Sequence, residues 1–104
     1  MNKEELLTDA EVFNYHGWRE QCKHITSELH ELTSAVYEYE LKYGEDGAHI
    51  NTMLDNICEE IADVEFMLNQ IKEYYELQQQ IINDWGRFKR ERESKRIKEG
   101  YYER

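Results

Sequence analysis

The chain of 104 residues contains no proline and only five glycines. Proline breaks the interior of a helix and glycine lowers its stability, so their scarcity removes the usual interruptions of long helices. At this length the chain fits one domain, near the lower end of sizes that support a hydrophobic core without help. We therefore predict an all-α fold in a single domain spanning residues 1–104.

Cysteine is also scarce, and long apolar runs are missing. Cys22 and Cys58 are too few for a disulfide scaffold, and each lies among apolar residues at helical spacing, which predicts two small core residues in a reducing compartment. No apolar run approaches the length of a membrane span, and residues 1–5 lack the apolar core of a signal peptide. We expect a cytoplasmic protein that does not act at a membrane.

Basic residues are in deficit, because 13 lysines and arginines stand against 23 acids, for a net charge of −10. This charge argues against binding a nucleic-acid polymer, whose phosphates would repel the chain. Residues 1–83 carry 5 basic and 18 acidic side chains, whereas residues 84–104 carry 8 basic and 5 acidic ones. An acidic body with a basic C-terminal segment is suited to hold a cation in one part and an anion in the other; solvated charged surfaces are the simpler alternative.

Apolar periodicity and turn residues predict four helices. They cover residues 3–14, Trp18 to Tyr43, about His49 to Gln80, and Asn83 or Asp84 to Lys98, the last being a basic C-terminal helix closed by Gly100. Gly-Glu-Asp-Gly at residues 44–47 supplies a turn, so we expect the two long helices to form an antiparallel hairpin within a four-helix bundle. The modest hydrophobic content of 39% favours a homo-oligomer that buries more surface.

Each long helix carries an apolar seam that alternates steps of four and three residues, the heptad pattern of packed helices. In the second helix the seam consists of Trp18, Cys22, Ile25, Leu29, Leu32, Val36, Tyr39 and Tyr43. In the third helix it consists of Ile50, Leu54, Ile57, Ile61, Val64, Leu68, Ile71 and Tyr75. We predict that the two seams face each other.

Two pairs of carboxylates border these seams at equivalent positions. A shift of 32 residues superposes Glu28 on Glu60 and Glu31 on Asp63. Residues three apart are neighbours on a helix, so each pair presents two carboxylates to one point, and two facing pairs repel unless a cation lies between them. Oxygen-only coordination suits Mg²⁺ or Mn²⁺. The pattern therefore predicts a metal site.

Two other interpretations of these acids compete with a magnesium or manganese site. Glu-x-x-Glu is common on acidic helices, and Glu73 and Glu76 also match it, so solvated surface acids remain an alternative. A di-iron site requires Glu-x-x-His on two helices, and none of the four histidines has a glutamate three positions before it. A redox metal is therefore disfavoured, and the histidines are expected on the surface or in turns.

The basic C-terminal segment carries Lys89, Arg92 and Arg96 at spacings of three and four, so they share one helix face. Arg92 continues the stripe begun by Trp85 and Phe88, which predicts that its guanidinium turns toward the body of the protein. Such a face near a metal-carboxylate cluster suits a polyphosphate, because arginine and lysine neutralise phosphate oxygens. Pairing of these cations with nearby acids is the alternative.

These motifs resemble those of the MazG-like, all-α nucleoside triphosphate pyrophosphohydrolase superfamily. That family is marked by Glu-x-x-Glu on one helix and Glu-x-x-Asp on the next, which read here Glu28-Leu29-His30-Glu31 and Glu60-Ile61-Ala62-Asp63. Gln21 matches a glutamine frequent in the family, and the similarity spans about Trp18 to Gly100. Ser27 is a departure, since many members have a further glutamate there that is not counted among the metal ligands.

The resemblance implies Mg²⁺-dependent hydrolysis of a nucleoside triphosphate to the monophosphate and pyrophosphate, with Mn²⁺ as a substitute and a dimer or tetramer as the assembly. It implies catalytic and metal-binding roles for Glu28, Glu31, Glu60 and Asp63. Together with the basic face, it implies substrate-binding roles for Gln21, Lys89, Arg92 and Arg96. A non-catalytic helical oligomerisation module and a nucleotide-binding regulatory module are the alternatives.

Overall fold

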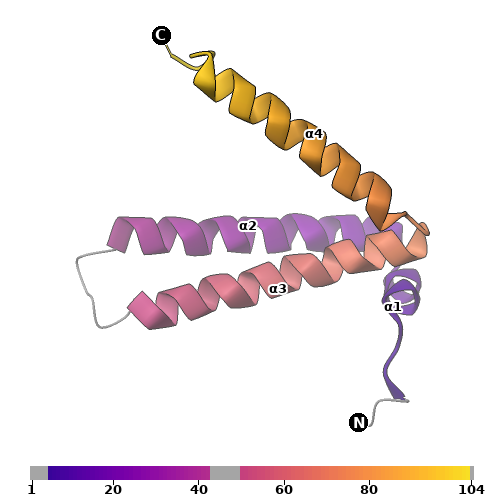
Figure 1. The fold of residues 1–104 in the computed structure, drawn as a ribbon. Coiled ribbons are helices and arrows are strands. Elements are labelled where there is room, and N and C mark those ends of the chain that lie inside the picture. The colour runs from indigo at the N-terminus through magenta and orange to yellow at the C-terminus, as the bar shows by residue number, and fades with distance from the viewer. Residues whose placement is uncertain (1–4, 43–49, 104) are drawn as a thin grey trace.

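The computed structural model describes residues 5–42 and 50–103, and over these residues it contains helices and no strand (Figure 1). The helices are α1 (Asp9–His16), α2 (Trp18–Lys42), α3 (Ile50–Tyr74) and α4 (Gln79–Lys98). The predicted all-α class is confirmed. The turn expected at residues 44–47, and the helix boundaries predicted at residue 3, Tyr43 and His49, lie outside the described residues. None of the described helices is both long enough and apolar enough to cross a membrane.

A capping box fixes the start of α1, which begins and ends later than the predicted span of 3–14. The Thr8 hydroxyl accepts a hydrogen bond from the Glu11 backbone N–H at 3.2 Å, and the Glu11 carboxylate accepts one from the Thr8 N–H at 3.1 Å. Both bonds satisfy donors that have no partner inside the helix. Gly17 follows at φ 85°, a conformation that favours glycine, and turns the chain so that α1 crosses one end of the α2–α3 pair (Figure 1).

A residue in the left-handed region ends α3 at Tyr74, earlier than predicted. Glu76 has φ 53°, the Leu77 N–H donates to the Lys72 carbonyl at 2.8 Å, and the Glu76 N–H donates to the Glu73 carbonyl at 3.1 Å. These two bonds form the Schellman arrangement that closes a helix. The short connection that follows allows α4 to leave in a new direction.

The start of α4 also differs from the prediction, which placed it at Asn83 or Asp84. The helix begins at Gln79, where Gln79 and Gln80 donate side-chain hydrogen bonds to Asn83 and Asp84, each at 2.8 Å. Asp84 therefore lies inside the first two turns of α4, where its carboxylate accepts a hydrogen bond from Gln80, one turn earlier. Gly100, at φ 74°, closes α4 as predicted.

α2 and α3 lie side by side and run in opposite directions (Figure 1). Only half of each predicted seam lies between them. The seam residues that turn inward are Ile25, Leu32 and Tyr39 of α2 and Ile50, Ile57, Val64 and Ile71 of α3. Those that stay exposed are Trp18, Cys22, Leu29 and Val36 of α2, Leu54, Ile61 and Leu68 of α3, and Tyr75 just after it. The prediction that the complete seams face each other is therefore wrong.

Residues outside the predicted seams, some of them polar, fill the other inward positions of both helices. In α2 these residues are Gln21, Glu28 and Ala35, and in α3 they include Glu60 and Met67. This rotation leaves Cys22 and Cys58 exposed, so the prediction that they are core residues is also wrong. The space between the helices is consequently part apolar and part polar.

A buried amide pair joins α2 to α3. The Gln21 Nε2 donates to the Gln70 Oε1 at 2.6 Å, and neither side chain has more than 4% of its surface exposed. The Gln70 Nε2 in turn lies 3.6 Å from the Met67 sulfur. Because an unpaired buried amide costs free energy, this pair favours one register of α2 against α3.

Phe13 attaches α1 to the end of the helix pair. Its side chain is buried, and its ring centroid lies 4.5 Å from that of Tyr74 and 5.8 Å from that of Tyr75. Aromatic pairs at these separations contribute beyond their buried area. α1, α2 and α3 therefore form the packed part of the molecule.

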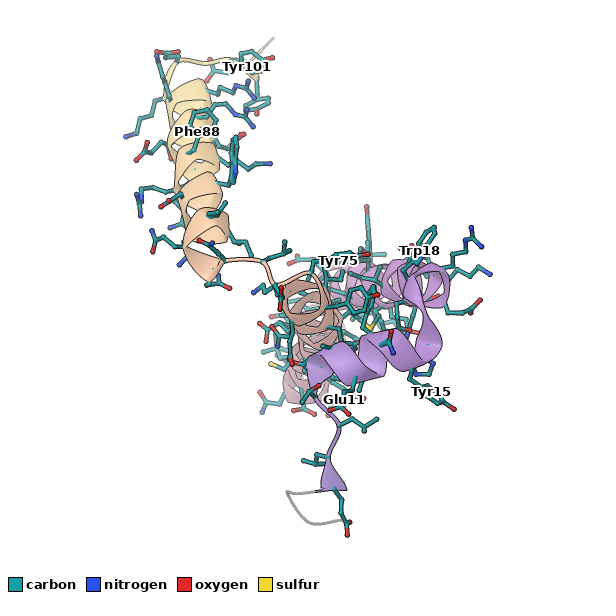
Figure 2. The ribbon with its side chains drawn as sticks, turned by 90° about the vertical axis from the view of Figure 1, so that its right-hand side faces the viewer. Glu11, Tyr15, Trp18, Tyr75, Phe88 and Tyr101 are labelled. Atoms are coloured by element: carbon teal, nitrogen blue, oxygen red, sulfur yellow. The ribbon has the colours of Figure 1, made fainter. Side chains whose placement is uncertain are left out.

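α4 rises away from these three helices, on the side opposite α1 (Figures 1 and 2). Its apolar residues Ile81, Trp85 and Phe88 are all more than half exposed. Arg92 lies over the Phe88 ring, with its guanidinium carbon 5.7 Å from the ring centroid, so the expectation that it turns toward the body is wrong. The described part of one chain packs three helices together and leaves the fourth apart.

Replacement of Phe13 by alanine should lower the free energy of unfolding by about 3–5 kcal/mol, because it leaves a cavity against Tyr74 and Tyr75. The matched control is Tyr15→Ala on the same helix, whose side chain is exposed and which should change stability by less than about 0.5 kcal/mol. Urea unfolding followed by circular dichroism measures both. Equal effects of the two substitutions would contradict the packing of α1.

Candidate metal centre

Four carboxylates converge midway along α2 and α3. One carboxylate oxygen from each of Glu28, Glu31, Glu60 and Asp63 lies within 4.8 Å of the other three. Each helix contributes two acids one turn apart, and the antiparallel pairing of the helices places the two pairs opposite each other. The structure therefore brings together the four acids that the sequence singled out. We call them the acidic cluster.

Two members of the acidic cluster direct an oxygen between the helices. Glu28 Oε2 and Glu60 Oε2 are shielded from solvent and have no hydrogen-bond partner. Asp63 is half-buried, and Glu31 is exposed. Shielding a carboxylate oxygen from water without providing a hydrogen-bond donor is unfavourable. A cation between the helices would compensate for this cost at both oxygens.

Burial raises the pKa of Glu28 and of Glu60 above the usual value of 4.5. Repulsion from Glu31 and Asp63 raises the pKa of both groups further, whereas the neighbouring His24 lowers that of Glu28. A raised carboxyl pKa means that the folded protein favours binding a positive charge at this point, either a proton or a metal ion.

His24 is a neighbour of the cluster that the sequence analysis missed. Its Nε2 lies 2.9 Å from Glu28 Oε1, which occupies one oxygen of that carboxylate and leaves Oε2 for the cluster. Hydrogen bonds of this kind orient carboxylates that bind metals. The available signal was the spacing of four residues between His24 and Glu28, which places them on one helix face.

The donor set fits a hard divalent ion. All four candidate ligands are carboxylates, and Mg²⁺ and Mn²⁺ prefer oxygen ligands. Within residues 5–42 and 50–103, the ion pairs that involve the cluster include His24 and no lysine or arginine. The two shielded oxygens thus have no protein cation to balance them, which is the arrangement that an ion would complete.

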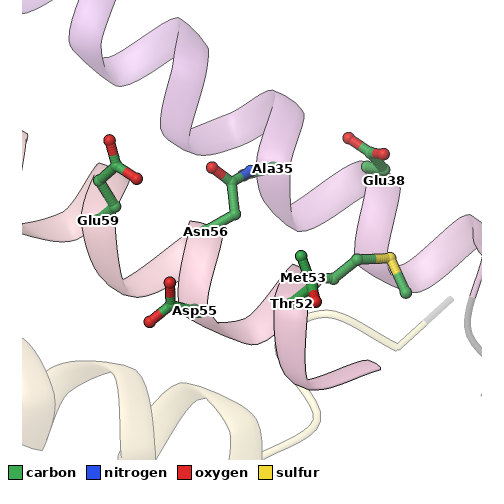
Figure 3. A pocket seen from close by; sticks show the side chains of 7 residues that line it. All are labelled: Ala35, Glu38, Thr52, Met53, Asp55, Asn56 and Glu59. Atoms are coloured by element: carbon green, nitrogen blue, oxygen red, sulfur yellow. The ribbon is translucent and has the colours of Figure 1, made fainter. Parts of the chain in front are cut away.

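A hollow of about 310 Å³ lies between α2 and α3 (Figure 3). Ala35 and Glu38 of α2 line it together with Thr52, Met53, Asp55, Asn56 and Glu59 of α3. Glu38 follows Glu31 by seven residues and Asn56 precedes Asp63 by seven, so the hollow continues the same faces of both helices. The Asn56 amide points toward α2 in Figure 3.

A second hollow, of about 290 Å³, lies toward α1. One of its lining residues is His24, the neighbour of Glu28 in the cluster. Its lining is His16, Glu20, Gln21, Lys23, His24 and Ser27. Of its basic side chains, His24 contacts the cluster through Glu28, whereas Lys23 pairs with Glu20 at 3.3 Å. The sequence patterns predicted phosphate-binding cations only in the C-terminal segment.

The four predicted substrate-binding residues are not gathered at the cluster. Gln21 is buried, and its amide is engaged with Gln70. Lys89, Arg92 and Arg96 lie on α4, apart from the α2–α3 pair (Figure 1), and the Arg96 guanidinium stacks on Tyr101 at 5.0 Å. One chain alone does not present these cations to the acids.

Replacement of Glu60 by glutamine should raise the melting temperature at neutral pH when divalent cations are chelated. The folded wild-type protein carries a raised pKa at this position relative to the unfolded chain, so its carboxylate is destabilising above that pKa and the penalty disappears as the pH falls to 4.5 or below. The advantage of Glu60→Gln should shrink over the same range. Thermal unfolding with Glu59→Gln, an exposed neighbour outside the cluster, provides the control; an equal gain in both variants would contradict the prediction.

Comparison with known proteins does not assign the chain to a family. Neither protein-family models nor curated proteins nor solved structures yield a match. The resemblance to MazG-like enzymes therefore depends on the two acidic motifs and their surroundings. What the chain does has to be inferred from the geometry of the acidic cluster.

Proposed function

We propose that the chain is a Mg²⁺-dependent pyrophosphohydrolase that cleaves a nucleoside or deoxynucleoside triphosphate to the monophosphate and pyrophosphate. The observation that carries this proposal is the acidic cluster with its two shielded, unpartnered oxygens. A cluster of this kind suits a metal ion, and metal ions commonly neutralise the charge of transferring phosphoryl groups. The reaction class follows from the resemblance of the two motifs to MazG-like enzymes.

In this proposal Glu28, Glu31, Glu60 and Asp63 hold the ion. A bound Mg²⁺ supplies positive charge to the phosphate oxygens and lowers the pKa of water. Glu28 or Glu31 accepts a proton from the attacking water. The water oxygen bonds to the α-phosphorus while the bridging bond to the β-phosphate breaks, which releases pyrophosphate.

The hollows on either side of the cluster support one orientation of the substrate. The hollow at Asn56 is lined by carboxylates, which repel phosphate, but also by the Asn56 amide, the Thr52 hydroxyl and Met53, which suit a nucleoside. The hollow at His24 contains His16 and Lys23, which suit the β- and γ-phosphates if Lys23 exchanges its exposed pairing with Glu20 for a phosphate oxygen. The nucleoside therefore occupies the first hollow and the phosphates extend toward the second.

Lys89, Arg92 and Arg96 keep a substrate-binding role only if α4 reaches the acidic cluster of a second copy. α4 stands apart from its own α2–α3 pair and exposes both its basic and its apolar residues. We therefore include a homo-oligomer, dimer or tetramer, in the proposed function.

A panel of nucleoside and deoxynucleoside triphosphates, assayed for pyrophosphate with Mg²⁺, tests the activity. The wild-type protein should release pyrophosphate from at least one nucleotide, and Glu60→Gln should reduce kcat by at least about 100-fold, the size of effect typical of losing a group that stabilises charge in the transition state. Glu65→Gln should retain activity, because Glu65 is an exposed acid of α3 that lies outside the acidic cluster and lines neither hollow. Absence of pyrophosphate with every nucleotide and with both Mg²⁺ and Mn²⁺ would refute the enzyme.

The second candidate is a non-catalytic helical oligomerisation module or a nucleotide-binding regulator. The observation that favours it is the separation of the basic residues of α4 from the acidic cluster. Binding without product would identify the regulator, and neither binding nor product would identify the oligomerisation module.

Mg²⁺ should raise the melting temperature of the wild-type protein and leave that of Glu60→Gln nearly unchanged. Ion binding at about 100 times the dissociation constant stabilises a folded protein by about 2.7 kcal/mol, which differential scanning fluorimetry resolves as a shift of several degrees. Ca²⁺-free buffer and the Glu59→Gln variant are the controls. A wild-type protein whose melting temperature does not respond to Mg²⁺ or Mn²⁺ would remove the metal site.

A further inference from the structure

The hollow at Asn56 begins one helical turn from the acidic cluster. Asn56 precedes Glu60 by four residues on α3, and Ala35 follows Glu31 by four residues on α2, so each lies about 6 Å along its helix from the cluster. This offset leaves room for a ribose between a phosphate at the cluster and a base in the hollow. The volume of about 310 Å³ is at the lower end for small-molecule sites, which suits one planar ring system.

The charged side chains that line this hollow are all acidic. They are Glu38 of α2 and Asp55 and Glu59 of α3, and no lysine, arginine or histidine accompanies them in the lining. The Lys42 ammonium donates to Glu38 Oε1 at 3.2 Å, whereas no described residue forms a hydrogen bond or an ion pair with Glu59. An ionised carboxylate accepts hydrogen bonds and donates none. The hollow therefore favours a ligand edge that brings its own donors.

The Asn56 amide adds a group that both donates and accepts. It points toward α2, where Ala35 is small and buried (Figure 3). Among the described residues the Asn56 side chain also has no hydrogen-bond partner. An amide can form two hydrogen bonds with the edge of a base, and it can turn over to match either order of donor and acceptor. Asn56 by itself therefore does not distinguish one base from another.

Glu59 supplies the distinction, because a carboxylate cannot turn over in the same way. Glu59 and Asn56 are three residues apart and therefore neighbours on one face of α3. Cytosine and adenine carry an amino group beside a ring nitrogen that accepts a hydrogen bond. The amide can bind the ring nitrogen and one amino hydrogen, which leaves the second amino hydrogen for the carboxylate.

Uracil, thymine and hypoxanthine carry a carbonyl oxygen where cytosine and adenine carry the amino group. In the same pose this oxygen would meet the Glu59 carboxylate, so two acceptors would lose water without a donor between them. Such a contact rejects a ligand more strongly than a merely missing hydrogen bond. The acidic lining thus penalises the oxo bases and favours the amino bases.

We propose that the hollow at Asn56 selects nucleotides whose base is cytosine or adenine. Asn56 binds the amino group together with the adjoining ring nitrogen, and Glu59 accepts the second amino hydrogen. This inference rests on the proposed function, because the acidic cluster has to hold the phosphates through its ion. It adds the substrate class, which the reaction class leaves open.

Two pairs of nucleotides isolate the amino group. CTP and UTP, and likewise ATP and ITP, share ring size, sugar and phosphates and differ by an amino or an oxo group and the hydrogen on the adjoining ring nitrogen. In pyrophosphate-release assays, kcat/KM should be about 10-fold or more higher for the amino member, a ratio typical of specific contacts to a base edge. A ratio near one, or an inverted ratio, in the pair that the protein cleaves better would overturn the inference and leave the proposed activity standing.

Three variants test the assigned roles. Glu59→Gln provides an amide that can donate to a carbonyl oxygen, so the CTP to UTP ratio should fall toward one. Asn56→Ala should lower kcat/KM for CTP and UTP by similar factors, since the amide can pair with both bases. Glu65→Gln, which removes an exposed acid of α3 outside both hollows, should keep the wild-type ratio. A CTP to UTP ratio that Glu59→Gln leaves unchanged would contradict the role of this carboxylate.

Binding of uncleavable nucleotides separates base selection from catalysis. Isothermal titration with α,β-methylene CTP and α,β-methylene UTP in the presence of Mg²⁺ should give about 10-fold tighter binding of the cytosine analogue. That preference without pyrophosphate from any natural nucleotide would uphold base selection and refute the hydrolase. Equal affinities, or binding of neither analogue, would refute base selection whether or not pyrophosphate is released.

Discussion

Repulsion among Glu28, Glu31, Glu60 and Asp63 is the constraint to which the helix pair has to conform. Glu28 and Glu60 occupy inward positions that apolar residues fill in an ordinary helical hairpin, and one oxygen of each is shielded from water without a hydrogen bond. The folded chain keeps this arrangement at a cost, which raises the pKa of both groups. A divalent ion between these carboxylates would convert the cost into binding energy, and this is the physical basis of the proposed metal-dependent function.

The same constraint accounts for the exposure of apolar residues on both helices. With Glu28 and Glu60 turned inward, Leu29 and Ile61, which follow them directly, lie about 100° further around their helices and face outward. One rotation of each helix therefore brings the carboxylates together and exposes part of each apolar seam.

The register of the two helices depends on contacts away from the acids. Gln21 lies seven residues before Glu28, and Gln70 lies seven after Asp63, so the amide pair is on the faces that also carry the acidic cluster. Phe13 packs against Tyr74 and Tyr75 near the same end. Sliding one helix by a turn would break the amide pair and separate the acids. The Gln21–Gln70 hydrogen bond at one end of the helix pair thus helps to position the four carboxylates at its centre.

The sequence alone determined the helical class, the approximate extent of α2, and the adjacency of Glu28 to Glu31 and of Glu60 to Asp63, because these follow from local periodicity and from a spacing that one helix imposes by itself. The meeting of the two acid pairs was predicted from their equivalent seam positions, but it depends on the register of α2 against α3. It did not determine which half of each seam turns inward, because apolar and carboxylate positions lie within one residue of each other on the helix surface, and the choice depends on Gln21, Gln70 and α1. It also did not determine that His24 holds Glu28 or that α4 stands apart, since the first needs a side-chain conformation and the second depends on the left-handed turn at Glu76. Only the packing of the whole chain decides these, because each is a competition between contacts that are distant in sequence.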